Sequence, residues 1–402
     1  MITELSIEGF KSFGSPAETV DLGPLNFVVG ANASGKSNLL YALRFLQNAV
    51  AHDVSYAVSE MGGNAEVRNK RLRQRQHAKP VRLVLKIEKE FRFRFNHDSD
   101  QQDDLLVRSF EYTLVLDLRS EETPPRIEME LLTALVVRDG KSARVGLERS
   151  EDTVSVIDPT HGGGTRTIPV PEQEPTRLAL VGVGFFSLPA TILREEIRGW
   201  RFHNFVPSVA RQPYRDEPHV ILGPAGEKLA TILHRMSKDD RASIAQGLRA
   251  IVPGLKDVKT TKLPIEDTLA FQIVEDKLKA AINPASVSDG TVRLLALLVV
   301  TTWSVRNSSL ITIEEPENGV HPHLAEYLVD ILRSASEHSQ VIVTTHAPDL
   351  LDHLEPKEVV LCDKEDGFTI LKNASSVEDI EKFRKHFSLG ELWSQGAVGA
   401  IP

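Results

Sequence analysis

The spacing of apolar residues predicts an α/β chain that opens with strands and a helix. Apolar and polar positions alternate over residues 2–7, and a second short apolar segment at 20–22 follows a turn rich in glycine, serine and proline. This pattern predicts a two-stranded hairpin. Residues 25–29 are almost wholly apolar, which is typical of a buried strand. Four apolar residues then recur at helical spacing and predict a helix: Leu39, Leu43, Leu46 and Val50.

A long middle stretch, from Val81 to Ile157, keeps apolar residues at every second position. It predicts an antiparallel meander with one buried face. Phenylalanines occupy positions 91, 93 and 95, and arginines 92 and 94 fall on the opposite face. We therefore expect the rings to pack in a core, with a base-stacking platform as the alternative. The glycines at 162–164 and the prolines that follow them indicate a surface loop or a domain boundary.

Helical patterns dominate residues 176–252, where we expect helices over 226–236 and 239–251. A strand is expected over 269–274. We predict that residues 176–280 form a mainly helical insertion in the α/β chain.

The last third of the chain alternates strands and helices again. An apolar helix is expected over 292–303, and buried strands over 310–313 and 341–344. A helix between these strands begins near Pro322, since proline is favoured in a first turn. We predict that residues 281–402 join residues 1–175 in one composite unit.

Composition adds an expectation about the cell compartment. The chain has 402 residues, 41% of them hydrophobic, which is enough for a large core in two or more lobes. A single cysteine, Cys362, excludes an intrachain disulfide, and because it lies in an apolar run we expect it to be a buried structural thiol. No secretion signal is recognised at the start, and the apolar run 292–305 is too short to cross a bilayer. We expect a cytoplasmic protein with no membrane partner.

The chain carries a net charge of −9, so a nucleic-acid contact would need a local basic patch. One basic run exists between positions 68 and 79, and it contains Arg68, Lys70, Arg71, Arg73, Arg75 and Lys79. It could bind DNA or an acidic face of a partner, or it could be a solvated loop. Because no aromatic residue interrupts it, stacking on a single strand is disfavoured.

A phosphate-binding loop is the clearest chemical signal. Residues 30–37 match G-x-x-x-x-G-K-[ST] and lie between an expected strand and an expected helix. In such a loop backbone N–H groups and the helix N-terminus attract phosphate oxygens, Lys36 reaches the β- and γ-phosphates, and Ser37 ligates Mg²⁺. A flexible turn before an ordinary helix is the alternative. The expected nucleotide-binding residues are Gly30, Asn32, Ser34, Gly35, Lys36, Ser37 and Asn38.

Two carboxylates, Glu314 and Glu315, end the strand expected at 310–313. Adjacent carboxylates at the end of an apolar strand are costly unless they serve a cation, although a surface acidic turn is the alternative. We expect Glu314 to hold Mg²⁺ and Glu315 to polarise the attacking water. His346 directly follows the strand at 341–344 and could reach the γ-phosphate, although an isolated histidine there is more often structural.

The segment Ser288-Asp289-Gly290-Thr291 opens the apolar helix and on its own is a helix cap. Its place between the phosphate loop and the carboxylates resembles the order of Walker A, signature, Walker B and His switch in ABC-type ATPases. That resemblance implies an ATP-binding head in which Ser288 and Gly290 close on ATP held by a second copy of the chain. It also implies the fold: an ABC-type P-loop head with a mixed central sheet and an antiparallel β subdomain.

The resemblance extends over nearly the whole chain. Residues 7–13, Ile-Glu-Gly-Phe-Lys-Ser-Phe, resemble the opening of SMC/RecF-type ATPases. The phosphate loop, the signature, the segments 314–319 and 344–346, and the ending at 388–393 resemble the stand-alone ATPases of the AAA/OLD-like branch. The chain departs from the wider ABC pattern at Glu314, where aspartate is usual, and at signature residues 289 and 291. Gln74 and Gln76 are candidates for the Q-loop glutamine.

The resemblance implies an ATPase that dimerises around Mg-ATP, with Lys36, Glu315 and His346 as catalytic residues. Such a protein would act on DNA or drive an effector in genome maintenance or anti-phage defence. A slow regulatory or scaffold subunit that holds a nuclease or toxin partner is the main alternative. A nuclease of the overcoming-lysogenization type is disfavoured because the segment after His346 is too short for the added domain. The SMC-like opening disfavours a transporter subunit.

Overall fold

The computed structural model describes residues 1–72, 80–96, 102–118, 123–138, 140–150, 153–157, 165–169, 175–183, 187–218, 220–264 and 267–399. Its internal contacts divide the chain into two compact units. Unit 1 comprises Met1–Gly23, Ala31–Gly199 and Val360–Asn373, and unit 2 comprises Pro24–Gly30, Trp200–Val359 and Ala374–Pro402. The chain passes from unit 2 to unit 1 inside the phosphate loop, between Gly30 and Ala31.

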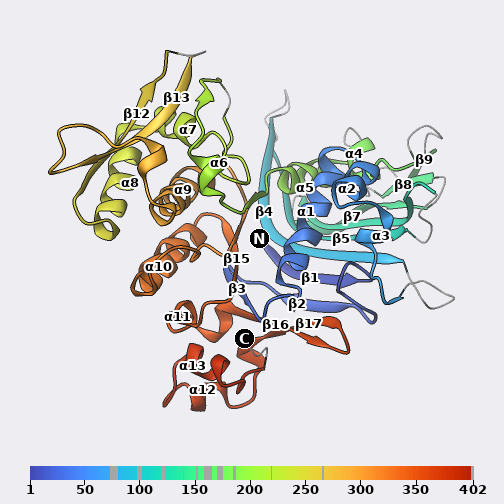
Figure 1. Ribbon diagram of the computed structural model, residues 1–402. Helices are drawn as coiled ribbons and strands as arrows, with labels where there is room; N and C mark the ends of the chain where they lie inside the picture. The colour runs from blue at the N-terminus through green and yellow to red at the C-terminus, as the bar shows by residue number, and fades with distance from the viewer. Residues whose placement is uncertain are drawn as a thin grey trace. The chain divides into compact units, whose positions relative to one another are not determined.

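Unit 1 is built on an antiparallel sheet with the strand order β2-β1-β4-β5-β6-β7-β8-β9 (Figure 1). The strands are β1 (Ile2–Glu8), β2 (Glu18–Asp21), β4 (Val81–Asn96), β5 (Gln102–Asp117), β6 (Arg126–Arg138), β7 (Lys141–Arg149), β8 (Thr153–Ile157) and β9 (Thr165–Pro169). Successive odd residues of β4 from Val81 to Ile87 are buried, whereas Arg82 and Glu88 are exposed. The expected hairpin and meander are therefore confirmed.

Two details of this sheet differ from the sequence prediction. Strand β9 lies where glycines and prolines indicated only a loop, because the chain beyond them pairs with β8. The rings of Phe91 and Phe93 are only partly buried, so they do not form the full core stripe that alternation predicted. Phe91 meets Phe110 edge-on, with the ring centroids 6.0 Å apart. The side chain of Phe95 lies outside the described residues.

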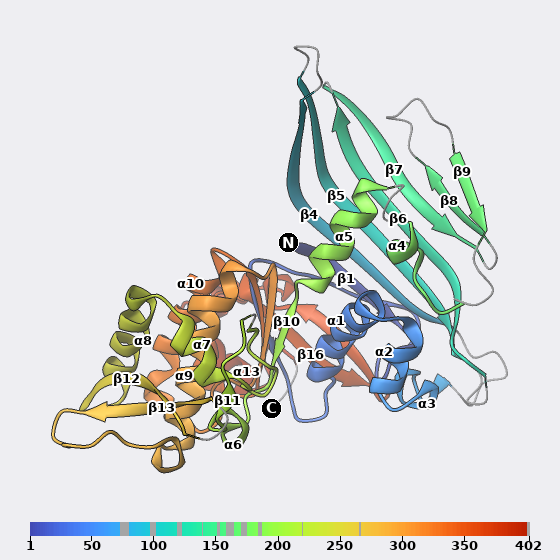
Figure 2. The ribbon, with the colours of Figure 1, turned by 90° about the horizontal axis from the view of Figure 1, so that it is seen from above.

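Helices cover the sheet of unit 1. They are α1 (Lys36–Ala51), α2 (Val54–Glu60), α3 (Asn64–Val67), α4 (Ala179–Gly182) and α5 (Leu188–Arg198). Figure 2 shows α4 and α5 lying across one face of the sheet, where both contact β7. The expected apolar positions of α1, from Leu39 to Val50, are buried. The hairpin of β16 (Val359–Glu365) and β17 (Phe368–Asn373) completes this unit, and β17 lies against β2.

Unit 2 contains four parallel strands in the order β10-β14-β15-β3. Their bounds are β10 (Arg201–His203), β14 (Leu310–Glu314), β15 (Gln340–Thr345) and β3 (Leu25–Val29). All residues of β3 and β15 are buried, as expected for strands covered on both faces. Because the strands are parallel, their carboxyl ends lie at one edge.

The rest of unit 2 combines helices with a small antiparallel sheet, β11-β13-β12. Its strands are β11 (Tyr214–Arg215), β12 (Leu255–Lys262) and β13 (Thr268–Glu275). Its helices are α6 (Pro207–Ala210), α7 (Leu229–Arg235), α8 (Lys238–Ile251), α9 (Asp289–Trp303), α10 (Ala325–Ser336), α11 (Pro348–Leu351), α12 (Ile380–Phe383) and α13 (Leu389–Ser394). Within the ranges given above, no helix has both the length and the apolarity needed to cross a membrane.

The expected helices at 226–236 and 239–251 correspond to α7 and α8, and Ser237 caps α8 by accepting a hydrogen bond from the amide of Asp240 at 3.0 Å. The section 176–252 also contains β10 and β11, which helical patterning did not indicate because both strands are very short. At Pro322 the chain first forms a 3₁₀ turn, and α10 begins only at Ala325.

Candidate functional site

The phosphate loop has the backbone that its sequence predicts. Strand β3 ends at Val29, and α1 begins at Lys36. Two loop residues have positive φ, Ala33 at 65° and Gly35 at 118°. A left-handed backbone just before a helix turns successive amide groups toward one side of the loop, which is the geometry of an anion-binding nest. The Nζ of Lys36 donates to the Ala31 carbonyl at 2.9 Å, so the ammonium group lies over the loop.

Residues distant in sequence brace this loop within unit 1. The Thr369 hydroxyl donates to the Ser34 carbonyl at 2.7 Å and lies 2.6 Å from the Ser12 hydroxyl oxygen. The Asn38 amide also donates to that Ser12 oxygen, at 2.6 Å. A Cβ at Gly35 would lie 2.0 Å from Thr369 Oγ1, so only glycine fits there. Ser12 belongs to the SMC/RecF-like opening, which therefore supports the loop directly.

The loop's single thiol neighbour is structural. Ser34 donates to Cys362 Sγ at 3.5 Å, and Cys362 is fully buried. Burial raises the pKa of this thiol to about 11. A thiol held protonated in an apolar site is a poor nucleophile. The expected buried cysteine is therefore confirmed.

The carboxylates lie at the end of β14 in unit 2. Glu314 pairs in register with Thr344 of β15, and the Glu315 amide donates to the Thr344 carbonyl at 2.9 Å. Glu315 has φ +45°, a conformation that non-glycine residues seldom adopt and that costs about 1–3 kcal/mol. Its Oε2 accepts a hydrogen bond from Asn318 Nδ2 at 2.7 Å. The turn after β14 therefore fixes the direction of the Glu315 carboxylate.

His346 follows β15 and faces the carboxylates of that turn. Its Nδ1 lies 3.5 Å from Glu315 Oε1 and 3.7 Å from Glu317 Oε1. Glu317 Oε1 also accepts hydrogen bonds from the Thr345 hydroxyl, at 2.5 Å, and from the His346 amide, at 3.2 Å. Burial raises the pKa of Glu317, and these donors partly offset that effect. Unit 2 thus brings Glu314, Glu315 and His346 to one sheet edge, as predicted.

The signature segment begins α9 in the same unit. Ser288 caps the helix by accepting from the Thr291 amide at 3.3 Å, and its side chain is exposed. Arg211 holds the segment from outside: it donates to the carbonyls of Pro284 and Val287 at 3.0 and 2.6 Å, and to Asp289 at 2.5 Å.

Gly290 lies against the turn that follows the carboxylates. A Cβ on Gly290 would lie 2.2 Å from the Gly319 carbonyl oxygen. The signature segment and the turn that carries Glu315 are therefore in backbone contact, and any side chain at position 290 would separate them.

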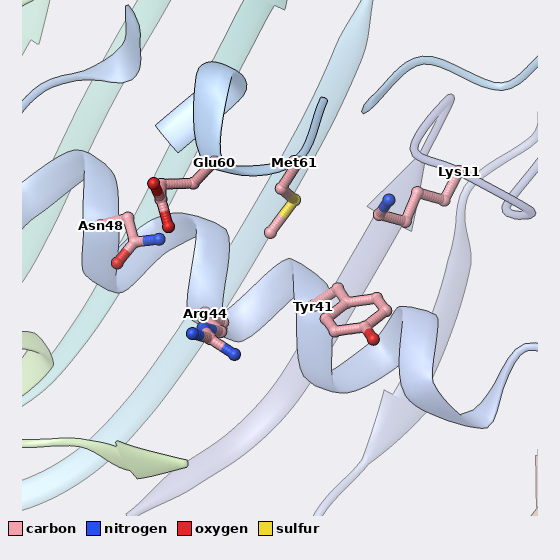
Figure 3. A pocket seen from close by; sticks show the side chains of 6 residues that line it. All are labelled: Lys11, Tyr41, Arg44, Asn48, Glu60 and Met61. Atoms are coloured by element: carbon pink, nitrogen blue, oxygen red, sulfur yellow. The ribbon is translucent and has the colours of Figure 1, made fainter. Parts of the chain in front are cut away.

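A pocket of about 320 Å³ opens along the outer face of α1 in unit 1 (Figure 3). It is lined by Lys11, Tyr41, Arg44, Asn48, Glu60 and Met61. The Lys11 ammonium lies 5.3 Å from the centre of the Tyr41 ring and donates to the Glu66 carbonyl at 3.3 Å. Burial lowers the pKa of Lys11. The sequence gave no indication of this pocket, because its residues come from three separate segments.

The basic run at 68–79 is only partly described. Arg68 is buried and donates to the Leu118 carbonyl at 3.2 Å, so its place in an exposed patch was wrong. Arg71 donates to the Asp366 carbonyl, and Lys70 pairs with Glu66 at 2.7 Å. The remaining members, Arg73, Arg75 and Lys79, lie outside the described residues, as do the candidate Q-loop residues Gln74 and Gln76.

Comparison with known proteins decides the family. A family model described as "AAA domain, putative AbiEii toxin, Type IV TA system" matches residues 25–151 and 183–352, which is more than half of the chain. The chain belongs to this AAA-domain family. No curated protein matches it.

Solved structures of SMC heads are similar to this chain. An SMC head bound to the C-terminal winged-helix domain of ScpA has a TM-score of 0.53 at 14% identity and covers 92% of this chain and 97% of that one. The SMC head from Thermotoga maritima has a TM-score of 0.43 at 12% identity and covers 92% of this chain and 98% of that one. An SMC head bound to the C-terminal domain of ScpA, derived from Pyrococcus furiosus, has a TM-score of 0.45 at 13% identity. It covers 95% of this chain and 99% of that one. The first match shows an SMC-head fold and the family model an AAA domain, so the predicted resemblance to P-loop ATPases of the SMC-like and AAA-like kind is confirmed.

The sequence prediction missed four residues that build the site. Thr369 and Ser12 brace the phosphate loop, Arg211 holds the signature segment, and Glu317 joins the ends of β14 and β15. Glu317 had a signal in the sequence, as a third carboxylate in the run 314–317, and Ser12 lies in the opening segment 7–13. Arg211 and Thr369 are common polar residues far along the chain from the motifs that they contact.

Proposed function

We propose that this protein binds ATP with Mg²⁺ at residues 30–38 and hydrolyses it. One observation carries the proposal: the parallel order β14-β15-β3 brings the ends of three strands to one edge of unit 2. The phosphate loop continues from β3, the carboxylates end β14, and His346 follows β15. Ligands of α/β proteins bind outside the carboxyl ends of parallel strands.

The residues of the loop fit a nucleotide. Lys36 and the loop amides would bind phosphate oxygens, and the positive φ values of Ala33 and Gly35 already turn the backbone for that role. Ser37 and Glu314 would supply oxygen ligands to Mg²⁺, which when bound offsets charge on the phosphates. The described ranges contain no cluster of three or more metal-binding side chains. This fits an ion held largely by phosphates and water.

Hydrolysis needs an oriented water. Glu315 would accept a hydrogen bond from that water, since its carboxylate is fixed by Asn318 and is about one-third exposed. His346, whose side chain is 43% exposed, would donate to a γ-phosphate oxygen. Glu317 joins the two segments that carry these groups, so they would act together.

We also propose that two copies close around ATP. The exposed Ser288 and the neighbouring Gly290 would complete the partner's γ-phosphate site. The cycle of closing and opening would then operate on DNA or on a separate effector, in a cytoplasmic genome-maintenance or anti-phage role. The second candidate, a slow subunit that holds a toxin or nuclease, is supported by the toxin-antitoxin system in the family description.

The test compares ATP hydrolysis and self-association of three variants with the wild type. Lys36→Ala should lose nucleotide affinity, because it removes the loop's ammonium group. Glu315→Gln should stop hydrolysis and accumulate an ATP-bound dimer, seen as an ATP-dependent rise in light scattering. Glu326→Gln, an exposed change on α10, serves as the matched control. A Glu315→Gln protein that hydrolyses ATP at the wild-type rate would refute the assignment.

A further inference from the structure

The Glu317 carboxylate links the turn after β14 to the end of β15. One oxygen, Oε1, accepts hydrogen bonds from the Thr345 hydroxyl at 2.5 Å and from the His346 amide at 3.2 Å. The Thr345 hydroxyl oxygen in turn accepts from the Ala347 amide at 3.0 Å. Glu317 therefore fastens Thr345, the last residue of β15, and the two residues after it to the turn that follows β14.

Burial makes this attachment firm. The Glu317 side chain is 12% exposed, and Thr345 is fully buried. Hydrogen bonds to a carboxylate are stronger than those between neutral groups, and a low-dielectric site strengthens them further. Water therefore competes poorly for the hydrogen bonds of Glu317. A movement of the turn would carry His346 with it.

The histidine ring is held between two carboxylates. Nδ1 of His346 lies 3.5 Å from Glu315 Oε1 and 3.7 Å from Glu317 Oε1. These two distances place the ring beside both carboxylates, so a displacement of His346 would change its position relative to Glu315.

We propose that Glu317 is the positioning residue for His346: it sets the position of the histidine relative to Glu315 through its hydrogen bonds to Thr345 and the His346 amide. The inference rests on the proposed ATPase function, in which His346 and Glu315 act on the same γ-phosphate. Glu317 needs no contact with nucleotide for this role. Its side chain acts through Thr345 and His346 alone.

Three substitutions separate the hydrogen bonds from the charge. Glu317→Ala removes both accepted bonds and should lower kcat roughly 10- to 100-fold, the effect of a misplaced catalytic group. Nucleotide affinity should stay unchanged, because the phosphate loop is intact. Glu317→Gln keeps an amide oxygen for both bonds and should stay within about threefold of wild type. Thr345→Val, which removes one donor without changing shape, should fall between them, and Glu326→Gln should behave as wild type.

A second readout does not depend on hydrolysis. In backbone ¹H–¹⁵N NMR spectra the His346 amide resonance should stay near its wild-type position in Glu317→Gln and shift in Glu317→Ala, because that amide donates to Glu317. Circular dichroism at the assay temperature confirms that each variant is folded. A folded Glu317→Ala protein with the wild-type kcat and the wild-type His346 amide resonance would overturn the inference. So would a Glu317→Gln protein as impaired as Glu317→Ala, or equal losses in affinity and kcat.

The two proposals fail in different ways. If wild type hydrolyses ATP, Glu315→Gln does not, and Glu317→Ala matches wild type, then the positioning role alone is wrong. If the wild type does not hydrolyse ATP, the proposed function is wrong, and the amide resonance of His346 still decides whether Glu317 positions the histidine.

Discussion

Acidification should destabilise this protein through His203, the last residue of β10. The side chain is 2% exposed, and its ring stacks on Phe205 with centroids 5.5 Å apart. Neither ring nitrogen has a hydrogen-bond partner of normal geometry among the described residues. Burial lowers the pKa of His203 from 6.5 to about 4, and the backbone of Gly223 offsets this only in part.

Proton linkage gives the sign and size of the change in the free energy of unfolding on acidification. The unfolded chain binds a proton at His203 near pH 6.5, whereas the folded chain resists protonation down to about pH 4. The neutral histidine's contribution is therefore fully present above pH 6.5 and is lost as the pH falls from 6.5 toward 4. A difference of 2.5 pKa units corresponds to about 3 kcal/mol in total, of which about 2 kcal/mol is lost by pH 5.

The assay is urea unfolding between pH 8 and pH 4.5, followed by circular dichroism. His203→Phe keeps an apolar ring against Phe205 and removes the titrating group, so its free energy of unfolding should fall less steeply on acidification. The difference between the two proteins isolates His203 from the other twelve histidines and from the carboxylates. His338→Gln, an exposed change, should keep the wild-type slope. Equal slopes for wild type and His203→Phe would refute the reasoning.

Three further predictions follow from the site. Gly35→Ala should lower nucleotide affinity at least about tenfold, because the added Cβ would lie 2.0 Å from Thr369 Oγ1. A fluorescence titration measures this affinity, and adding Thr369→Ala to the variant should not weaken binding further. Arg211→Gln should leave ATP affinity unchanged but weaken ATP-dependent self-association in light scattering, since Asp289 and two carbonyls lose their donor; unchanged association would contradict this. Cys362 should resist thiol reagents in the native protein and react only on unfolding, and rapid native labelling would show that it is not buried.

Much of the fold could be predicted because its local signals are strong. Strand β3 occupies the predicted residues 25–29, and the meander and α9 follow their apolar periods. The positions of Glu314 and His346 followed from the same logic, since each comes at the end of an apolar run that proved to be a parallel strand.

Long-range contacts explain what the sequence could not provide. Thr369 lies 335 residues beyond Ser34, whose carbonyl it contacts, and nothing in its own neighbourhood marks it. Arg68 belongs to a basic run, and a run of like charges predicts solvent exposure. Its burial depends on the Leu118 carbonyl at the end of the β5 segment, a partner that only the folded chain supplies.

The turn after β14 shows how these two kinds of information combine. The apolar strand places Glu315 at the sheet edge, but its φ of +45° is unfavourable by about 1–3 kcal/mol and must be imposed by other contacts. The Glu315 amide bonds to Thr344, its carboxylate bonds to Asn318, and Glu317 bonds to Thr345 and His346. Each bond joins this turn to itself or to the end of β15, so the strained conformation persists only while β14 and β15 stay paired. The arrangement of Glu315 and His346 is therefore a property of the sheet edge as a whole, and a change at Glu317 tests it without touching either residue.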